Sequence, residues 1–443
     1  MTDPSRVARR AALLAPLALG GCGLWDRWFG THKTPLAGKR EPVLTGQGGL
    51  TPDEGVPKVV LPAATPNAGW PQMGGNPAHL MGHLAAGDAL AEVWTAGIGE
   101  GGGYRRIILA QPVIADGGVY VMDSDATVTA LDLANGGQRW RFDTRKEDDD
   151  STNIGGGLAW DQGTVYAVNG LADLVALDAA KGTVRWRASL GASARSAPTV
   201  AEGRVFVTTI QDQLLAFATD DGRRLWSYQA SNATTGMLGS PAPAYARGLV
   251  IGGFASGELA TLRIETGNVV WTDTLASRGA SATPANVSSI RGLPVVVQGR
   301  VFAISLGGLL IGLDLPTGRR LWDREVSGLD TPWAAGDWLF VVSSGQRMAA
   351  IHQADGRVAW STELPRWQDP DKQTDPITWF GPALAGDRLI VAGTSEEALA
   401  VSPYTGAILG RQKLSGAAAP VGPVVAANTV FIVSDDGRLL ALR

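Results

Sequence analysis

ALDAAKGTVRWRASL, residues 176–190, is one of a series of related phrases along the chain. Its variants include ALDLANGGQRWRFD, AFATDDGRRLWSYQ, TLRIETGNVVWTDTL, GLDLPTGRRLWDREV and AIHQADGRVAWSTEL. The tryptophan of each phrase falls at one of these positions: Trp140, Trp186, Trp226, Trp271, Trp322 and Trp360. Two members are degenerate, with Trp94 in LAEVWTAGI and Gly410 in the tryptophan position of AVSPYTGAILGRQ. The eight positions are 38–51 residues apart, which is the period of a four-stranded propeller blade.

Three columns recur in seven of these phrases. Four residues before the tryptophan position stands a glycine, at Gly136, Gly182, Gly222, Gly267, Gly318, Gly356 and Gly406. Nine residues before it stands an apolar residue, such as Leu177, and ten before it a small one, such as Ala176. Glycine allows a tight turn with positive φ, and tryptophan covers a large area between blades. We expect the small residue to leave room where neighbouring sheets pack face to face.

A second motif precedes each phrase and supplies two further strands. In PVIADGGVYV and PTVAEGRVFV, for example, a short apolar strand, a turn and another apolar strand follow one another. Eight such pairs occur, and the last is followed by SDDGRLLALR without a second turn or a tryptophan. The strand around Trp94 is therefore expected to complete the last blade. The sequence predicts an all-β fold, an eight-bladed β-propeller of four-stranded antiparallel blades, with the ring closed by pairing of N- and C-terminal strands.

The first residues have the pattern of an export signal. Three arginines precede the apolar run AALLAPLAL, and small residues precede Cys22 in LGGC. This order is typical of a bacterial lipoprotein signal peptide over residues 1–21, with Cys22 as the lipidated residue. An ordinary signal peptide with an incidental cysteine is the alternative. Gly23 follows the cysteine where an aspartate would favour retention in the inner membrane, so we expect the outer membrane.

Residues 22–68 contain scattered prolines and glycines and no apolar period. We expect them to form a flexible linker between the lipid and a propeller over residues 69–443. The formal net charge of the chain is −4, and removal of residues 1–21, with three arginines and one aspartate, leaves −6. This acidic balance argues against a nucleic-acid partner, because binding to phosphates requires basic surface.

The phrase LDxxxGxxxW is the repeat of pyrroloquinoline-quinone-type propellers, and the whole arrangement resembles the BamB family of outer-membrane β-barrel assembly lipoproteins. The ending VVAANTVFIVSDDGRLLALR and the segment WPQMGGNPAHLMGHL, residues 70–84, are similar to parts of that family. The resemblance implies a non-enzymatic scaffold on the periplasmic face of the outer membrane, with no catalytic residue, cofactor or metal. It implies as partners the barrel-insertion protein (BamA-like) and unfolded outer-membrane proteins.

The resemblance also places the partner contacts on loops at one end of the propeller. Here these loops are NATTGMLGSPAP, residues 232–243, and ASRGASATP, residues 276–284. Well-known members carry an arginine in the first loop and acidic residues in the second, and this chain departs from both patterns. We expect Met237, Leu238 and Arg278 to contact the partner.

A periplasmic quinoprotein-like oxidoreductase with quinone and calcium is the alternative function, and ligand binding on the propeller face is a third. Cys22 is the only cysteine, so the chain has neither a vicinal cysteine pair nor a CxxCH haem motif. A central Asp base with Asn and Glu calcium ligands stays open at this stage. The Ala- and Gly-rich inward strands favour the scaffold.

Four smaller features need an interpretation. GIGEGG, residues 97–102, lacks the strand-to-helix context of a dinucleotide site and is expected to be a loop. KEDDD, residues 146–150, could hold calcium, but a solvated loop is the better interpretation. His79 and His83 are spaced like metal ligands on a helix but have no third ligand. NVSSIRGLP, residues 286–294, is an insertion relative to the other blades, either a contact loop or a tolerated addition.

Overall fold

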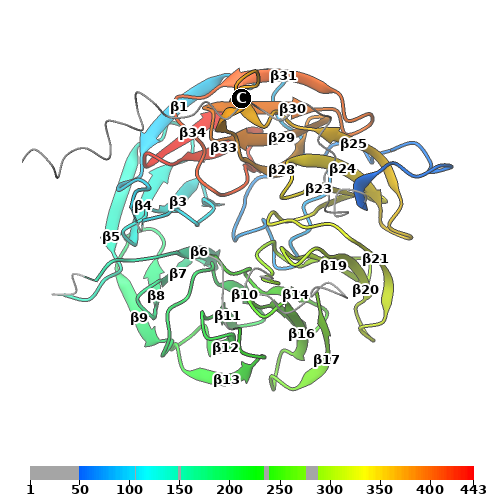
Figure 1. Ribbon diagram of the computed structural model, residues 1–443. Helices are drawn as coiled ribbons and strands as arrows, with labels where there is room; N and C mark the ends of the chain where they lie inside the picture. The colour runs from blue at the N-terminus through cyan, green and yellow to red at the C-terminus, as the bar shows by residue number, and fades with distance from the viewer. Residues whose placement is uncertain (1–48, 105, 148–150, 234–238, 276–287) are drawn as a thin grey trace, which may run out of the picture. The chain divides into compact units, whose positions relative to one another are not determined.

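The computed structural model describes residues 49–104, 106–147, 151–233, 239–275 and 288–443, within a compact unit that spans residues 46–443. Eight antiparallel sheets of four strands each surround a common centre (Figure 1). The predicted all-β, eight-bladed propeller is therefore confirmed. The described residues contain no α-helix, and none of their segments is a helix long and apolar enough to cross a membrane.

Each blade runs outward from the ring centre in strand order. Blade 1 consists of β2 (Val113–Ala115), β3 (Gly118–Met122), β4 (Thr127–Asp132) and β5 (Gln138–Asp143); blade 2 of β6 (Gly156–Asp161), β7 (Thr164–Asn169), β8 (Asp173–Asp178) and β9 (Val184–Ser189); blade 3 of β10 (Thr199–Ala201), β11 (Arg204–Thr208), β12 (Gln213–Ala218) and β13 (Arg224–Gln229); and blade 4 of β14 (Ala244–Ala246), β15 (Leu249–Gly253), β16 (Glu258–Arg263) and β17 (Val269–Thr274).

The second half of the ring follows the same plan. Blade 5 consists of β18 (Val295–Val297), β19 (Arg300–Ile304), β20 (Leu310–Asp314) and β21 (Arg320–Arg324); blade 6 of β22 (Trp333–Ala335), β23 (Trp338–Val342), β24 (Arg347–His352) and β25 (Val358–Glu363); blade 7 of β28 (Trp379–Ala385), β29 (Arg388–Gly393), β30 (Glu397–Val401) and β31 (Ile408–Lys413); and blade 8 of β32 (Val424–Ala426), β33 (Thr429–Ser434), β34 (Arg438–Leu442) and β1 (Glu92–Gly97). A separate hairpin, β26 (Trp367–Asp369) and β27 (Thr374–Pro376), lies between blades 6 and 7 in the chain.

The ring closes in blade 8, where strands from the two ends of the propeller pair. β1 lies antiparallel to β34, with Trp94 opposite Ala441 and Gly97 opposite Arg438. Figure 1 shows this junction at the meeting of the cyan β1 and the red β34. Because the last blade takes its outermost strand from the start of the propeller, the two ends are held by the same hydrogen bonds as any other blade. This confirms the predicted closure.

The small residue ten positions before each tryptophan position has a more specific structural role than the one expected from the sequence. Ala176 on β8 lies opposite Tyr166 on one side and Trp186 on the other. The two aromatic rings meet across it, with centroids 5.9 Å apart. The same three-strand arrangement recurs in blade 1 (Tyr120, Trp140), blade 3 (Phe206, Trp226), blade 5 (Phe302, Trp322), blade 6 (Phe340, Trp360) and blade 8 (Phe431, Trp94). The small residue lets an aromatic pair form within one sheet, rather than between sheets.

The glycine and tryptophan columns join neighbouring blades. Gly182 has φ of +70°, and a Cβ there would lie 2.6 Å from the indole of Trp140 in the preceding blade. The indole Nε1 of Trp140 donates to the carbonyl of Ala179, 2.9 Å away in the same turn. Equivalent hydrogen bonds lead from Trp186, Trp226, Trp271, Trp322 and Trp360 to the next blade. These six tryptophans therefore link neighbouring blades.

Gly410 occupies the tryptophan position in blade 7, and the closing blade explains the exception. The turn that a tryptophan would cover lies between the third and fourth strands of the next blade. In blade 8 those strands are β34 and β1, which come from opposite ends of the propeller. A Cβ on Gly410 would meet nothing within 4 Å.

Residues 49–68 differ from the expected flexible linker. Leu50 is buried among apolar residues of blades 5 and 6, and Val59 among apolar residues of blades 6 and 7. The backbone N–H of Asp53 donates to the carbonyl of Val358 (2.9 Å), and its carboxylate accepts from the backbone N–H of Val358 (2.8 Å). Asp53 also pairs with Arg324. Apolar side chains scattered among the prolines thus anchor this stretch to the outer strands. The prediction of a flexible linker therefore applies only to residues 22–48.

Residues 65–85, here called the circular segment, run around the ring and contact all eight blades. It begins at blade 8, where Asn67 accepts from Ala427 N–H. Trp70 pairs with Ile114 of blade 1, Pro71 accepts from Trp160 of blade 2, and Gln72 binds both backbone groups of Val200 in blade 3. Pro77 and Ala78 accept from Tyr245 and Val296 of blades 4 and 5, Gly82 from the indole of Trp333 in blade 6, and Leu84 pairs with blade 7.

These contacts have a common backbone cause. The innermost strand of a blade has no neighbour on its inner edge, so its N–H and C=O groups need partners from elsewhere. The circular segment supplies partners close to the first turn of each blade, although in blade 6 the contact is made by the indole of Trp333 rather than by the backbone. It therefore covers one end of the ring centre, and the connections between blades border the other end.

Candidate functional site at the ring centre

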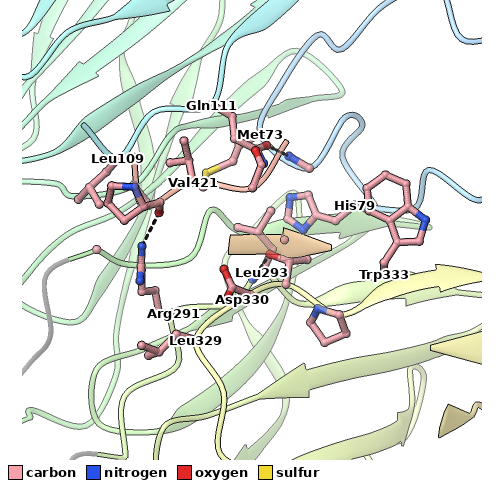
Figure 2. Close-up of a pocket in the computed structure, with 18 of the residues that line it drawn as sticks. Met73, His79, Leu109, Gln111, Arg291, Leu293, Leu329, Asp330, Trp333 and Val421 are labelled. Carbon is pink, nitrogen blue, oxygen red and sulfur yellow. Dashed lines mark hydrogen bonds between the residues drawn. The ribbon is translucent and has the colours of Figure 1, made fainter. Parts of the chain in front are cut away.

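A cavity lies at the ring centre, here called the central funnel. The circular segment contributes Trp70, Met73 and His79 to its lining. The other lining residues come from the connections that lead into the innermost strands, including Leu109 and Val421 (Figure 2). The space in which a water molecule can be centred is about 80 Å³, enough for a few waters or one slender group.

Among the described residues, three charged side chains line the funnel, and two of them are arginines. Arg195 precedes blade 3, Arg291 precedes blade 5 and Asp330 precedes blade 6. Arg291 donates from Nη2 to the carbonyl of Pro420, 2.7 Å away on the opposite wall (Figure 2). Asp330 retains partial solvent contact, but burial raises the pKa of its carboxyl to about 6, against the opposing effects of Arg291 and the Gly381 N–H.

His79 lies at the covered end of the funnel. Its φ is 56°, its side chain is buried, and its Nδ1 lies 2.7 Å from the carbonyl of Pro294. Because a carbonyl can only accept, Nδ1 carries the proton, and Nε2 is left as an acceptor without a described partner. Burial lowers the pKa of His79 to about 4, so the ring is neutral at neutral pH.

Gln111 ties the circular segment to the rest of the funnel wall. Its Oε1 accepts from the backbone of Gly74 (2.9 Å) and from the indole of Trp70 (3.3 Å), and its Nε2 donates to Gly422 O (3.3 Å). Trp70 in turn stacks with Trp333, with ring centroids 6.2 Å apart. The apolar part of the lining is therefore held in place by a hydrogen-bonded frame.

The residues predicted to contact a partner lie outside the described residues. These are Met237, Leu238 and Arg278, and Cys22 lies outside as well. Gly239 and Ser240, which belong to the described part of the first predicted loop (residues 232–243), line the central funnel. The predicted contacts stay predictions.

The smaller sequence features are placed as follows. His79 and His83 bind separate carbonyls, of Pro294 and Pro62, and share no ligand. In GIGEGG the backbone of Glu100 binds the carboxylate of Asp123 within a loop. In KEDDD, Lys146 pairs with Asp173 (3.1 Å), and residues 148–150 are not described. The insertion over residues 286–294 brings Arg291 and Leu293 into the funnel, so its described part is a lining element.

Sequence reasoning left open whether the ring centre binds a ligand, and it missed the circular segment. The signal was present in part, because Trp70 begins the apolar segment WPQMGGNPAHLMGHL. Gln72 and Asn67 gave no signal, since an isolated amide side chain is common in loops. Their contacts join residues 128 and 358 positions apart in the chain.

A calcium–quinone group does not fit the described residues of the funnel. Calcium requires several oxygen ligands, and Asp330 is the one carboxylate in the described lining. No group of three or more His, Cys, Asp or Glu residues suited to a metal occurs in the described parts of the chain.

The fold and the repeat define the class: an eight-bladed propeller with the pyrroloquinoline-quinone-type repeat. Solved structures with this fold include BamB from Moraxella catarrhalis, with a TM-score of 0.68 and 21% identity over 80% of this chain and 99% of that chain. Quinohemoprotein alcohol dehydrogenase from Comamonas testosteroni has a TM-score of 0.63 and 13% identity over 86% of this chain and 81% of that chain. At these identities both likenesses show the fold alone.

The sequence comparison identifies the family. The chain belongs to the family described as "Outer membrane protein assembly factor BamB", whose sequence model matches residues 124–362 and 366–443. A relative with that name from Burkholderia pseudomallei is 27% identical over 359 residues, covering 80% of this chain and 87% of the relative. One from Vibrio cholerae is 29% identical over 350 residues, covering 79% and 88%.

Proposed function

We propose that this protein is a non-enzymatic scaffold in the assembly of outer-membrane β-barrel proteins, anchored by a lipid on Cys22 at the periplasmic face of the outer membrane. The observation that carries the proposal is the family match, which extends over blades 2 to 7, the outer two strands of blade 1 and three of the four strands of blade 8. The relatives carry the name of an assembly factor. The partner proposed on this basis is the barrel-insertion protein (BamA-like), with unfolded outer-membrane proteins as further partners.

The surface of the described residues supports a role in protein contacts. The hairpin β26–β27 pairs only with itself, and its residues 371–376 are exposed. A two-stranded hairpin has free edges that can add a strand from a partner. The absence of catalysis is part of the proposal, and the poor fit of the funnel to a calcium–quinone group is consistent with it.

We propose Met237, Leu238 and Arg278 as partner-contacting residues. A double substitution, Met237→Glu with Leu238→Glu, is to be introduced into the chromosomal copy in the source host. Leu409→Glu is the matched control, because Leu409 is an exposed apolar residue (56%) on the outer strand β31.

The readout is the amount of folded β-barrel protein in the outer membrane, compared with a strain that lacks the protein. The proposal expects the double variant to resemble that strain and Leu409→Glu to resemble the native strain, with both variants present at native levels. Unchanged β-barrel content in the strain that lacks the protein would overturn the proposed function. A loss in that strain combined with a fully active double variant would overturn only the proposed contact residues.

A further inference from the structure

The two arginines of the central funnel flank the same dipeptide. The carbonyl of Arg195 accepts from the backbone N–H of Ser240 (3.2 Å). On the other side, a Cβ added to Gly239 would lie 3.2 Å from Arg291 Nε. Arg195 Nε is buried without a hydrogen-bond partner among the described residues, and Arg291 acts electrostatically on the carboxylate of Asp330. The described lining contains two arginines and one carboxylate, which leaves it with an excess of positive charge.

Buried polar atoms without partners line the same space. Ser196 is 2% exposed and His79 is 5% exposed. Ser196 Oγ, Arg195 Nε and His79 Nε2 have no hydrogen-bond partner among the described residues. Buried polar groups are normally paired, so these atoms indicate that the funnel is built to contact something polar. Ser196 and Arg195 can donate, whereas His79 Nε2 can only accept.

The remaining lining is apolar and narrow. Trp70, Leu293 and Val421 contribute hydrocarbon surface, and the space open to the centre of a water molecule is about 80 Å³. Pockets with apolar walls and a few convergent polar groups are typical ligand sites. The small volume limits the size of the group, and the polar atoms select its chemistry.

We propose that the central funnel binds a carboxylate carried on a slender apolar stem that also bears an N–H or O–H donor. Arg195 and Arg291 pair with the carboxylate, Ser196 donates to it, and His79 Nε2 accepts from the donor on the stem. Such a group occurs in small acylated amino acids and at the carboxyl terminus of a peptide. The proposal does not depend on the proposed scaffold function.

The test is a titration of the full-length protein followed by the fluorescence of its tryptophans, since Trp70 and Trp333 lie in the funnel wall. The probes are N-acetylleucine, N-acetylleucinamide, which lacks the charge, and 4-methylpentanoate, which lacks the N–H donor. We expect saturable binding of N-acetylleucine at up to about 10 mM, and binding at least about tenfold weaker for each of the other two probes.

Two variants connect this binding to the funnel. Arg195→Gln removes a guanidinium whose Nε has no hydrogen-bond partner among the described residues, so the fold should tolerate it. We expect it to weaken binding of N-acetylleucine about tenfold. His79→Asn, which suits the positive φ, should reduce the preference for N-acetylleucine over 4-methylpentanoate. Arg223→Gln, at an exposed surface pair, is the matched control and should bind like the native protein.

A peptide arm distinguishes the two sources of the carboxylate. N-acetyl-Ala-Ala-Leu that binds more tightly than N-acetylleucine would assign the site to a peptide end, and weaker binding would assign it to a small acid. If neither N-acetylleucine nor N-acetyl-Ala-Ala-Leu binds saturably, the proposal is overturned. Binding that Arg195→Gln and His79→Asn leave unchanged would overturn it as well, because the ligand would then lie elsewhere.

Discussion

A Cβ on Gly182 would lie 2.6 Å from the indole ring of Trp140, and this contact joins blade 2 to blade 1. We predict that Gly182→Ala destabilises the protein by about 3 kcal/mol, because strain at positive φ adds to displacement of the indole. Gly163→Ala is the matched control: its φ of +75° is similar, but its Cβ would meet nothing within 4 Å. Strain alone should cost it about 1 kcal/mol. Urea denaturation measures both, and equal losses would contradict the packing role of the glycine column.

The indole hydrogen bonds between blades give a second prediction. Trp186→Phe removes the bond from Nε1 to the carbonyl of Thr219 (2.9 Å), and we expect a loss of about 2 kcal/mol from the bond and the lost ring area. Trp160→Phe is the control, because Trp160 Nε1 is buried without a described partner. Its substitution should cost less, since it also removes an unpaired donor. Denaturation midpoints that fall equally in the two variants would show that the bond to Thr219 contributes nothing.

The circular segment gives a third prediction. Gln72 is 5% exposed, accepts from the Val200 N–H at 2.9 Å and donates to the Val200 carbonyl at 3.3 Å. Gln72→Ala leaves these buried backbone groups unpaired, so we expect a loss of about 2–3 kcal/mol in unfolding free energy. Gln213→Ala, which removes only an exposed contact with Gln229, should change it by less than about 0.5 kcal/mol. A Gln72→Ala protein as stable as Gln213→Ala would mean that the segment is not anchored there.

Asp330 and His79, two titrating groups of the funnel, change the stability of the fold in opposite directions as pH falls. The carboxyl of Asp330, whose pKa is raised to about 6, takes up a proton on folding, so its contribution to stability grows as pH falls from about 6 to about 4. His79, whose pKa is lowered to about 4, must stay neutral, so its contribution is lost as pH falls from about 6.5 to about 4. The stability of the native protein as a function of pH therefore contains two changes of opposite sign, one from Asp330 and one from His79.

Single variants separate these changes. Relative to the native protein, Asp330→Asn should lose more thermal stability between about pH 7 and about pH 4.5, because only the His79 effect remains. His79→Asn should lose less over the same range. Asp371→Asn, in the exposed hairpin turn, serves as the control and should follow the native profile. Melting curves at several pH values provide the measurement, and parallel profiles for all four proteins would contradict the assignment.

The repeated phrase predicted the blades because each of its columns acts locally or on the next blade. Trp186 and Ala176 face each other across a ladder, and the Gly–Trp contact repeats at every junction but one. The spacing of the phrase was therefore enough to count blades and to place the closing strand. The cause of the small column was not predictable, because it depends on which residues face each other on three adjacent strands.

The circular segment and the funnel depend on contacts without a repeat. Each anchor of the segment is used once, by a different side chain or backbone group, so no period marks it. Asn67 binds the carbonyl of Val425, 358 residues away. Val59 could not be recognised as buried, because a single valine among prolines also occurs in flexible linkers. Such contacts follow from the assembled ring rather than from any local pattern.

The central claim is that this protein is a scaffold of the outer-membrane assembly machinery. The most direct measurement is purification of the full-length, C-terminally tagged protein from gently solubilised outer membranes of its own host, followed by identification of bound proteins. The account predicts recovery of the barrel-insertion protein, lost in the Met237→Glu, Leu238→Glu variant and kept in Leu409→Glu. Recovery of the propeller without the barrel-insertion protein, from membranes in which that protein is abundant, would contradict the account.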